Sequence, residues 1–204
     1  MSKKIIKRTI IFLMAYSLIT IVTVALTLIA VKQVKIEKEP INQSLYFPNK
    51  KMVKTFNKTP NEEGFIHIVD KIKDGRVQIK QVDSQTRVVM IYSISADSIK
   101  LIYTKELGYD DFEDDYIEDL IPNRDDFILK SPIEIGTNWS DGDGGIYEII
   151  KTNAVVETPA GTFEAIVVRY TNDEFTVKEY YAKDIGLIKI IVNNFGEYEL
   201  IQIK

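Results

Sequence analysis

An alternation of apolar and polar residues recurs along most of the sequence and limits the folds that the chain can adopt. A period of two residues places successive side chains on opposite faces, the pattern of strands buried on one face. Turn signals such as Asp74-Gly75 separate the alternating segments. These segments are residues 65–71, 77–82, 88–94, 99–103, 146–151, 163–170, 177–181, 187–192 and 198–203. Short strands at this spacing predict a mainly β fold, an antiparallel curved sheet that forms a half-barrel or a barrel-like structure.

Residues 106–126 depart from this alternation and are rich in aspartate and glutamate. Their apolar side chains recur at helical spacing, and Pro122 would end a helix. The apolar residues are Phe112, Tyr116, Ile117, Leu120 and Ile121. We therefore expect one short amphipathic helix here, lying across one mouth of the curved sheet.

The N-terminal part of the chain has the features of a membrane anchor. Residues 9–31 carry no charge, and four basic residues precede them. At about 1.5 Å per residue, a helix of this length crosses a bilayer core of about 30 Å, and the basic residues favour a cytoplasmic N-terminus. The alternative is a cleaved signal peptide, whose apolar core is usually shorter. The predicted parts are a cytoplasmic tail at 1–8, a transmembrane signal anchor at 9–31, a linker at 32–44 and an extracytoplasmic β domain at 45–204. The predicted location is the cell membrane, which the chain crosses once.

Charge and residue usage exclude several classes of function. The chain has 26 basic and 30 acidic side chains, so the part outside the cytoplasmic tail has 22 basic residues and a net charge of −8. Such a surface repels nucleic acid. Cysteine is absent, which excludes disulfides and thiolate metal sites, and His67 is the single histidine. Because no catalytic motif is visible, we predict neither an enzyme nor a bound cofactor.

Two kinds of polar residue are candidates for a site. His67 lies in an alternating strand on the face shared by Phe65 and Val69, and we interpret it as a satisfied or edge-exposed side chain. Asp141 and Asp143 are candidate calcium ligands, because spaced carboxylates with intervening glycines can form an oxygen cage. The twelfth residue counted from Asp141 is threonine instead of glutamate, so a polar hairpin loop is the alternative.

Four aromatic residues, Trp139, Phe163, Tyr180 and Tyr181, are candidates for lining a ligand cavity inside the curved sheet. The alternative is that these side chains fill the core. Both interpretations stay open, because large aromatic side chains serve both purposes.

Three motifs and an earlier Tyr-Phe-Pro give the chain a resemblance to a group of known proteins. They are Ile135-Gly136-Thr137-Asn138-Trp139, Thr158-Pro159-Ala160-Gly161-Thr162-Phe163, Tyr180-Tyr181-Ala182-Lys183-Asp184-Ile185-Gly186-Leu187-Ile188-Lys189 and Tyr46-Phe47-Pro48. Residues 45–204 thereby resemble a family of uncharacterised exported β domains of Gram-positive bacteria, usually lipoproteins. That family is similar in architecture to the LolA/LolB-type half-barrels that carry lipoproteins. The resemblance implies a fold and no catalytic residues. This chain departs from the family by having a predicted transmembrane helix in place of an acylated cysteine.

Together these features predict a membrane-anchored extracytoplasmic binding or scaffolding module of a bacterial cell envelope. The concave apolar face of the sheet would bind a lipid-like ligand or an envelope protein, and the N-terminal helix would hold the module at the membrane. Two alternatives stay open. One is a hydrolase of an envelope polymer that uses carboxylates of residues 106–126, identified by two carboxyl groups about 5–10 Å apart in a cleft. The other is a calcium-stabilised structural domain.

Overall fold

In the part of the chain that the structure describes, twelve antiparallel strands form one sheet, so the prediction of a mainly β fold is confirmed. The structure is a computed structural model that describes residues 42–59, 62–108, 110–118 and 120–204. The predicted cytoplasmic tail, the predicted anchor and most of the predicted linker lie outside these ranges. Within them, no helix has the length and apolar character needed to span a bilayer.

Each strand follows the alternating pattern of the sequence and is joined to the next by a turn or loop. The strands are β1 (Met52–Thr59), β2 (Glu62–Lys73), β3 (Arg76–Val82), β4 (Arg87–Ile94), β5 (Ser98–Glu106), β6 (Asp126–Lys130), β7 (Asn138–Ser140), β8 (Ile146–Thr158), β9 (Gly161–Thr171), β10 (Thr176–Ala182), β11 (Gly186–Val192) and β12 (Gly196–Ile203). A short 3-10 helix, η1 (Gln43–Tyr46), precedes them.

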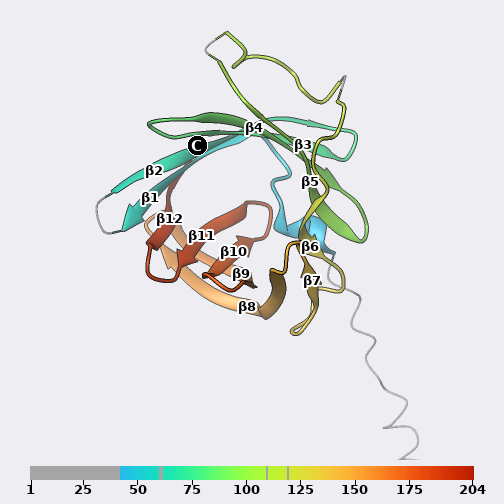
Figure 1. Cartoon of the computed structure of the whole chain (residues 1–204). Coiled ribbons are helices and arrows are strands. Elements are labelled where there is room, and N and C mark those ends of the chain that lie inside the picture. Colours follow the sequence, from blue (N-terminus) through green and yellow to red (C-terminus); the bar gives the residue numbers. More distant parts are fainter. Residues whose placement is uncertain (1–41, 60–61, 109, 119) are drawn as a thin grey trace, which may run out of the picture. The chain divides into compact units, whose positions relative to one another are not determined.

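The twelve-stranded sheet curls into a nearly closed barrel (Figure 1). Consecutive strands pair along the chain, and β1 pairs with β12 in the middle of the sheet. The two edge strands, β6 and β7, follow each other in the sequence and meet at a seam. There the indole N–H of Trp139 in β7 donates to the backbone oxygen of Phe127 in β6 over 3.1 Å. The sheet is therefore more closed than a half-barrel.

The inner face of the barrel is built from alternate residues of each strand. In β1, the buried residues Met52, Lys54 and Phe56 point inward, and the residues between them are more exposed. In the β1–β2 register, Lys54 lies opposite His67 and Phe56 lies opposite Phe65. Two polar residues therefore occupy inward positions between apolar neighbours on these adjacent strands.

One end of the barrel is closed by η1 and the residues that follow it. In a meander, every second turn lies at the same end of the sheet. At this end, η1 contacts the turn after β4, the loop after β6 and the turn after β10. The amide of Gln43 donates to the backbone oxygen of Ser95 (3.0 Å), and the Ser131 hydroxyl donates to Gln43 (2.6 Å). The backbone N–H of Asp184 donates to the oxygen of Leu45 (2.7 Å). Residues 43–44, which fall in the predicted linker, thus belong to the folded unit.

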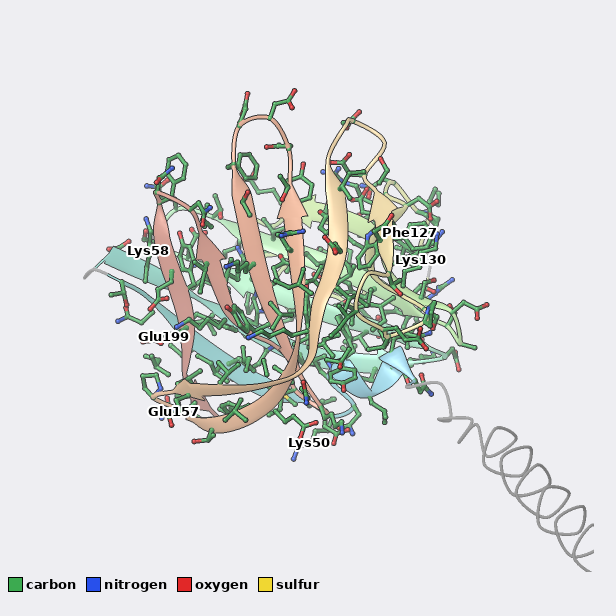
Figure 2. All side chains as sticks on the ribbon, turned by 90° about the horizontal axis from the view of Figure 1, so that it is seen from below. Lys50, Lys58, Phe127, Lys130, Glu157 and Glu199 are labelled. Atoms are coloured by element: carbon green, nitrogen blue, oxygen red, sulfur yellow. The ribbon has the colours of Figure 1, made fainter. Side chains whose placement is uncertain are left out.

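The β8–β9 hairpin extends beyond the end of β10 and reaches β12. The backbone N–H of Ala160, at the hairpin turn, donates to the oxygen of Leu200 in β12 over 3.2 Å. Figure 2 shows the result: Glu157 near the hairpin turn and Glu199 on β12 lie at the same side of the barrel. An apolar cluster covers this region, with Val156 and Ala165 from the hairpin and Ile188 and Leu200 among its buried members.

The predicted helix within residues 106–126 is wrong. The described residues of this segment form turns and bends and lie on the outer face of the sheet, where Ile117 packs against Val89 and Ile91 of β4. Side chains of β3 satisfy backbone groups that a helix would pair internally. Gln78 donates to the oxygen of Asp114 and accepts from the N–H of Tyr116, and Lys80 and Arg76 donate to further carbonyls. These tertiary hydrogen bonds replace those of a helix, and the apolar residues still become buried.

Candidate ligand cavity

The barrel encloses a cavity of about 860 Å³, which lies within the range of small-molecule binding sites. Its walls come from both halves of the sheet and combine polar side chains with apolar and aromatic ones, the latter from Phe65, Ile79, Met90, Leu187, Ile190 and Tyr198. Phe47 and Pro48, which follow η1, contribute to the lining at the closed end. Glu63, Gly64 and residues 83–86 line the opposite end, which we call the mouth. The cavity therefore has walls of mixed apolar and polar character and a polar rim.

Lys54 is buried in the wall of this cavity, with 1% of its surface exposed. Its ammonium donates to the backbone oxygens of Ile185 and Leu187, each over 3.0 Å. Among the described residues, no carboxylate lies within 4.0 Å of this amine. Burial without a counter-ion lowers the pKa of Lys54 to about 7. The two carbonyls hold the amine in place, and the charge itself is poorly compensated.

His67 lies opposite Lys54 and is also buried, with 5% of its surface exposed. Its ring packs against the rings of Phe65 (4.8 Å between centroids) and Phe56 (5.3 Å). Nε2 lies 2.9 Å from Oε1 of Gln81, while Nδ1 has no hydrogen-bond partner among the described residues. Burial, with a smaller effect of the nearby Lys54 charge, lowers the pKa of His67 to about 3, so the ring is neutral at physiological pH. The interpretation of a satisfied or edge-exposed histidine is therefore wrong for Nδ1.

Glu179 of β10 is the acidic side chain on the cavity wall away from the mouth. The hydroxyl of Tyr181, two residues along the same strand face, donates to its Oε2 over 2.7 Å. Burial raises the pKa of Glu179 above its ordinary value, and the Tyr181 hydrogen bond opposes this shift. Burial and, to a smaller extent, the Glu179 charge raise the pKa of Tyr181 well above its ordinary value. The same two causes raise the pKa of Tyr92, which also lines the cavity. Both phenols therefore remain protonated hydrogen-bond donors.

Of the four aromatic residues predicted to line a cavity, Tyr181 does so and the other three lie elsewhere. Trp139 is buried at the seam, where its indole stacks on Tyr147 with 5.5 Å between centroids. Phe163 and Tyr180 pack against the apolar cluster near the β8–β9 hairpin. The structure therefore separates these aromatic side chains into one cavity residue and three packing residues.

The candidate calcium loop at Asp141 is organised by its own hydrogen bonds. One oxygen of Asp141 accepts from the backbone N–H groups of Asp143 (2.8 Å) and Gly145 (2.9 Å), and the other accepts from the Tyr170 hydroxyl (2.8 Å). These bonds, chiefly that of Tyr170, lower the pKa of Asp141. Within the described ranges, no group of three or more His, Cys, Asp or Glu side chains is arranged to hold a metal ion. The geometry is that of a polar hairpin loop.

The sequence did not identify Lys54, Gln81 and Glu179 as site residues. A signal was present, because Lys54 falls between Met52 and Phe56 at the period that places all three on one strand face. A polar residue at an inward position of an alternating strand is therefore a useful indicator of a site.

No protein-family model matches the chain, and no curated protein matches it. A solved structure with some similarity is the crystal structure of a "putative exported protein with YmcC-like fold" from Bacteroides fragilis. The two chains are 15% identical with a TM-score of 0.44, and the match covers 78% of this chain and 99% of the other. Similarity at this level assigns neither a fold nor a function to the chain.

Proposed function

We propose that the chain is a membrane-anchored extracytoplasmic binding module that holds a lipid-like ligand inside its β-barrel. The observation that carries this proposal is the cavity of about 860 Å³, whose walls combine apolar side chains with a few polar groups and whose mouth is polar. A ligand with an alkyl part would remove both its own apolar surface and that of the walls from water, at about 25 cal/mol per Å². Four interior polar groups, on Lys54, His67, Gln81 and Glu179, would orient its polar part.

The place at the membrane rests on the sequence. The uncharged run of residues 9–31 and the basic residues before it support a single anchor with an outward-facing barrel. The resemblance of residues 45–204 to exported β domains of Gram-positive bacteria supports the same location. A linker of about a dozen residues would keep the module within a few tens of ångströms of the bilayer, so the module would receive its ligand locally.

The two alternative functions gain no support from the geometry. Carboxylates of residues 106–126 lie on the outer face and pair with lysines: Glu118 with Lys73 (2.7 Å), Asp125 with Lys100 (2.7 Å) and Asp111 with Lys105 (3.3 Å). These are the solvated ion pairs of a surface. In the candidate calcium loop, the carboxylate of Asp141 already accepts hydrogen bonds from the backbone N–H groups of Asp143 and Gly145.

A cavity-filling substitution tests the proposal. Met90→Trp would place an indole in the cavity, and Val155→Trp would add the same group at a position that is 75% exposed. We expect the full chain in phosphatidylcholine nanodiscs to bind an environment-sensitive alkyl dye. We expect Met90→Trp to lose most of this binding and Val155→Trp to retain it.

Circular dichroism would establish that both variants keep their β structure. Equal dye binding by the two folded variants would place the dye outside the barrel and refute the proposal. Native mass spectrometry of the chain extracted from its own membranes would then identify any ligand that copurifies with the unmodified protein and is lost from Met90→Trp.

A further inference from the structure

The wall of the cavity contains a buried ring nitrogen that has no hydrogen-bond partner among the described residues. Nδ1 of His67 is buried, has no partner among the described residues and belongs to a side chain that lines the cavity. A buried polar atom without a partner destabilises a folded protein, so native structures rarely keep one without a reason. A ligand that hydrogen-bonds to this atom would supply that reason.

The neighbouring contact determines which hydrogen bond Nδ1 can make. Because Oε1 of Gln81 lies 2.9 Å from Nε2 and can only accept, Nε2 carries the proton of the neutral ring. Nδ1 then holds a lone pair and accepts a hydrogen bond. The partner group on the ligand must therefore be a donor, such as a hydroxyl or an amine.

The charges around the cavity narrow the choice further. Two carboxylate side chains, Glu63 and Asp83, stand at the mouth, and Glu179 lies within, so an anionic head group would be repelled along its path, and a carboxylate has no proton to donate to Nδ1. The cation of the lining, Lys54, lies opposite His67 in the register and already donates to two backbone carbonyls. Its charge would disfavour an ammonium group placed at Nδ1.

We propose that the ligand is an uncharged amphiphile whose polar end is a hydroxyl group, which donates a hydrogen bond to Nδ1 of His67 while the alkyl part contacts the apolar walls. This inference rests on the proposed function and specifies its ligand class. Alcohols and glycerol esters of fatty acids have this chemistry, whereas free fatty acids at neutral pH and alkylamines do not.

The single histidine of the chain allows a direct test. A full chain purified without a histidine tag, labelled with ¹⁵N-histidine and held in phosphatidylcholine nanodiscs, gives one pair of ring nitrogen signals. We expect a protonated Nε2 and an unprotonated Nδ1 in the free protein, and a change of the Nδ1 signal when an alkanol binds. A proton on Nδ1 in the free protein would overturn the inference.

Affinities for three probes of equal alkyl length, an alkanol, an alkanoate and an alkylamine, complete the test. We expect the alkanol to bind about five- to tenfold more tightly than the other two, the effect of one net hydrogen bond, after correction for partition into empty nanodiscs. His67→Phe should remove this preference. The control Ile190→Val, which removes one methyl group from the apolar part of the wall on β11, should change the three affinities alike.

Each other outcome has a distinct meaning. Tightest binding of the alkanoate or the alkylamine would overturn the inference about the head group and leave the proposed binding function standing. Failure of all three probes to bind would refute the proposed function, and the ligand class with it. A preference for the alkanol that survives in His67→Phe would also overturn the role of Nδ1.

Discussion

Replacement of Lys54 by methionine should change the stability of the barrel in opposite directions at low and high pH. Burial lowers the pKa of Lys54 from 10.5 to about 7 in the folded protein. Between these two values the unfolded chain binds a proton that the folded chain does not, so the free energy of unfolding rises with pH. The difference corresponds to about 5 kcal/mol of destabilisation, which is fully present below about pH 7 and lost as the pH approaches 10.5. Methionine is similar in shape and carries no charge, so Lys54→Met would remove this pH-dependent destabilisation.

The hydrogen bonds of the amine act in the other direction. Lys54 donates to the carbonyls of Ile185 and Leu187, and methionine would leave both without this donor. Two lost hydrogen bonds cost about 2–3 kcal/mol. We therefore expect Lys54→Met to stabilise the protein by about 2 kcal/mol near pH 6 and to destabilise it by about 2 kcal/mol near pH 10.

The measurement is urea denaturation of the full chain and the variant at both pH values. The useful quantity is the change in the variant's effect between about pH 6 and about pH 10, expected at about 4 kcal/mol, because the hydrogen-bond contribution cancels from it. Lys50→Met is the control, since Lys50 projects into solvent (Figure 2) and its removal should have a small effect throughout. An effect of Lys54→Met that does not vary with pH would show that water or an anion already compensates the buried charge.

Three further substitutions test other parts of the structure. Because burial raises the pKa of Glu179, its carboxylate destabilises the folded protein above that pKa, so Glu179→Gln should raise the free energy of unfolding at neutral pH and lose this benefit below about pH 4. Trp139→Phe should lower the free energy of unfolding by about 1–1.5 kcal/mol, because the hydrogen bond to Phe127 is lost, and Trp139→Ala should lower it by about 3–5 kcal/mol. Urea denaturation measures both, and a small effect of alanine would show that the seam is open. Gly64→Ala should prevent or strongly weaken folding, because its Cβ would lie 1.8 Å from the backbone oxygen of Phe56, and a normal melting temperature would show that β1 and β2 are spaced differently.

Much of the sheet could be predicted from the sequence, because alternation is a local property. Every predicted alternating segment lies within an observed strand: residues 88–94, for example, lie in β4, and residues 146–151 lie in β8. The missed strands are β1, β6 and β7. In β1 the inward Lys54 interrupts the apolar series, and β6 and β7 are too short, at five and three residues, to show a period.

Closure of the barrel could not be predicted, because it depends on pairs that are distant in the sequence. The barrel forms when β1 pairs with β12, where Phe56 lies opposite Leu200, and when Trp139 bonds to Phe127 across the seam. The expected helix failed for a similar reason. The apolar spacing in residues 106–126 is real, but buried polar side chains of β3 compete for the backbone groups of that segment.

The same competition between local pattern and tertiary context explains why, of the four predicted aromatic residues, Tyr181 lines the cavity and the other three do not. Large aromatic side chains suggested a cavity, yet most of them pack where their area is fully used. The cavity also has polar residues at inward positions, Lys54, His67 and Glu179, where apolar side chains of similar volume would avoid the cost of burying a polar group. Lys54 and His67, poorly compensated polar groups on the adjoining strands β1 and β2, are a local conflict with the fold, and such conflicts concentrate at functional sites. If a ligand fills this cavity as we propose, it would occupy the retained volume and supply the hydrogen bond that Nδ1 of His67 lacks among the described residues.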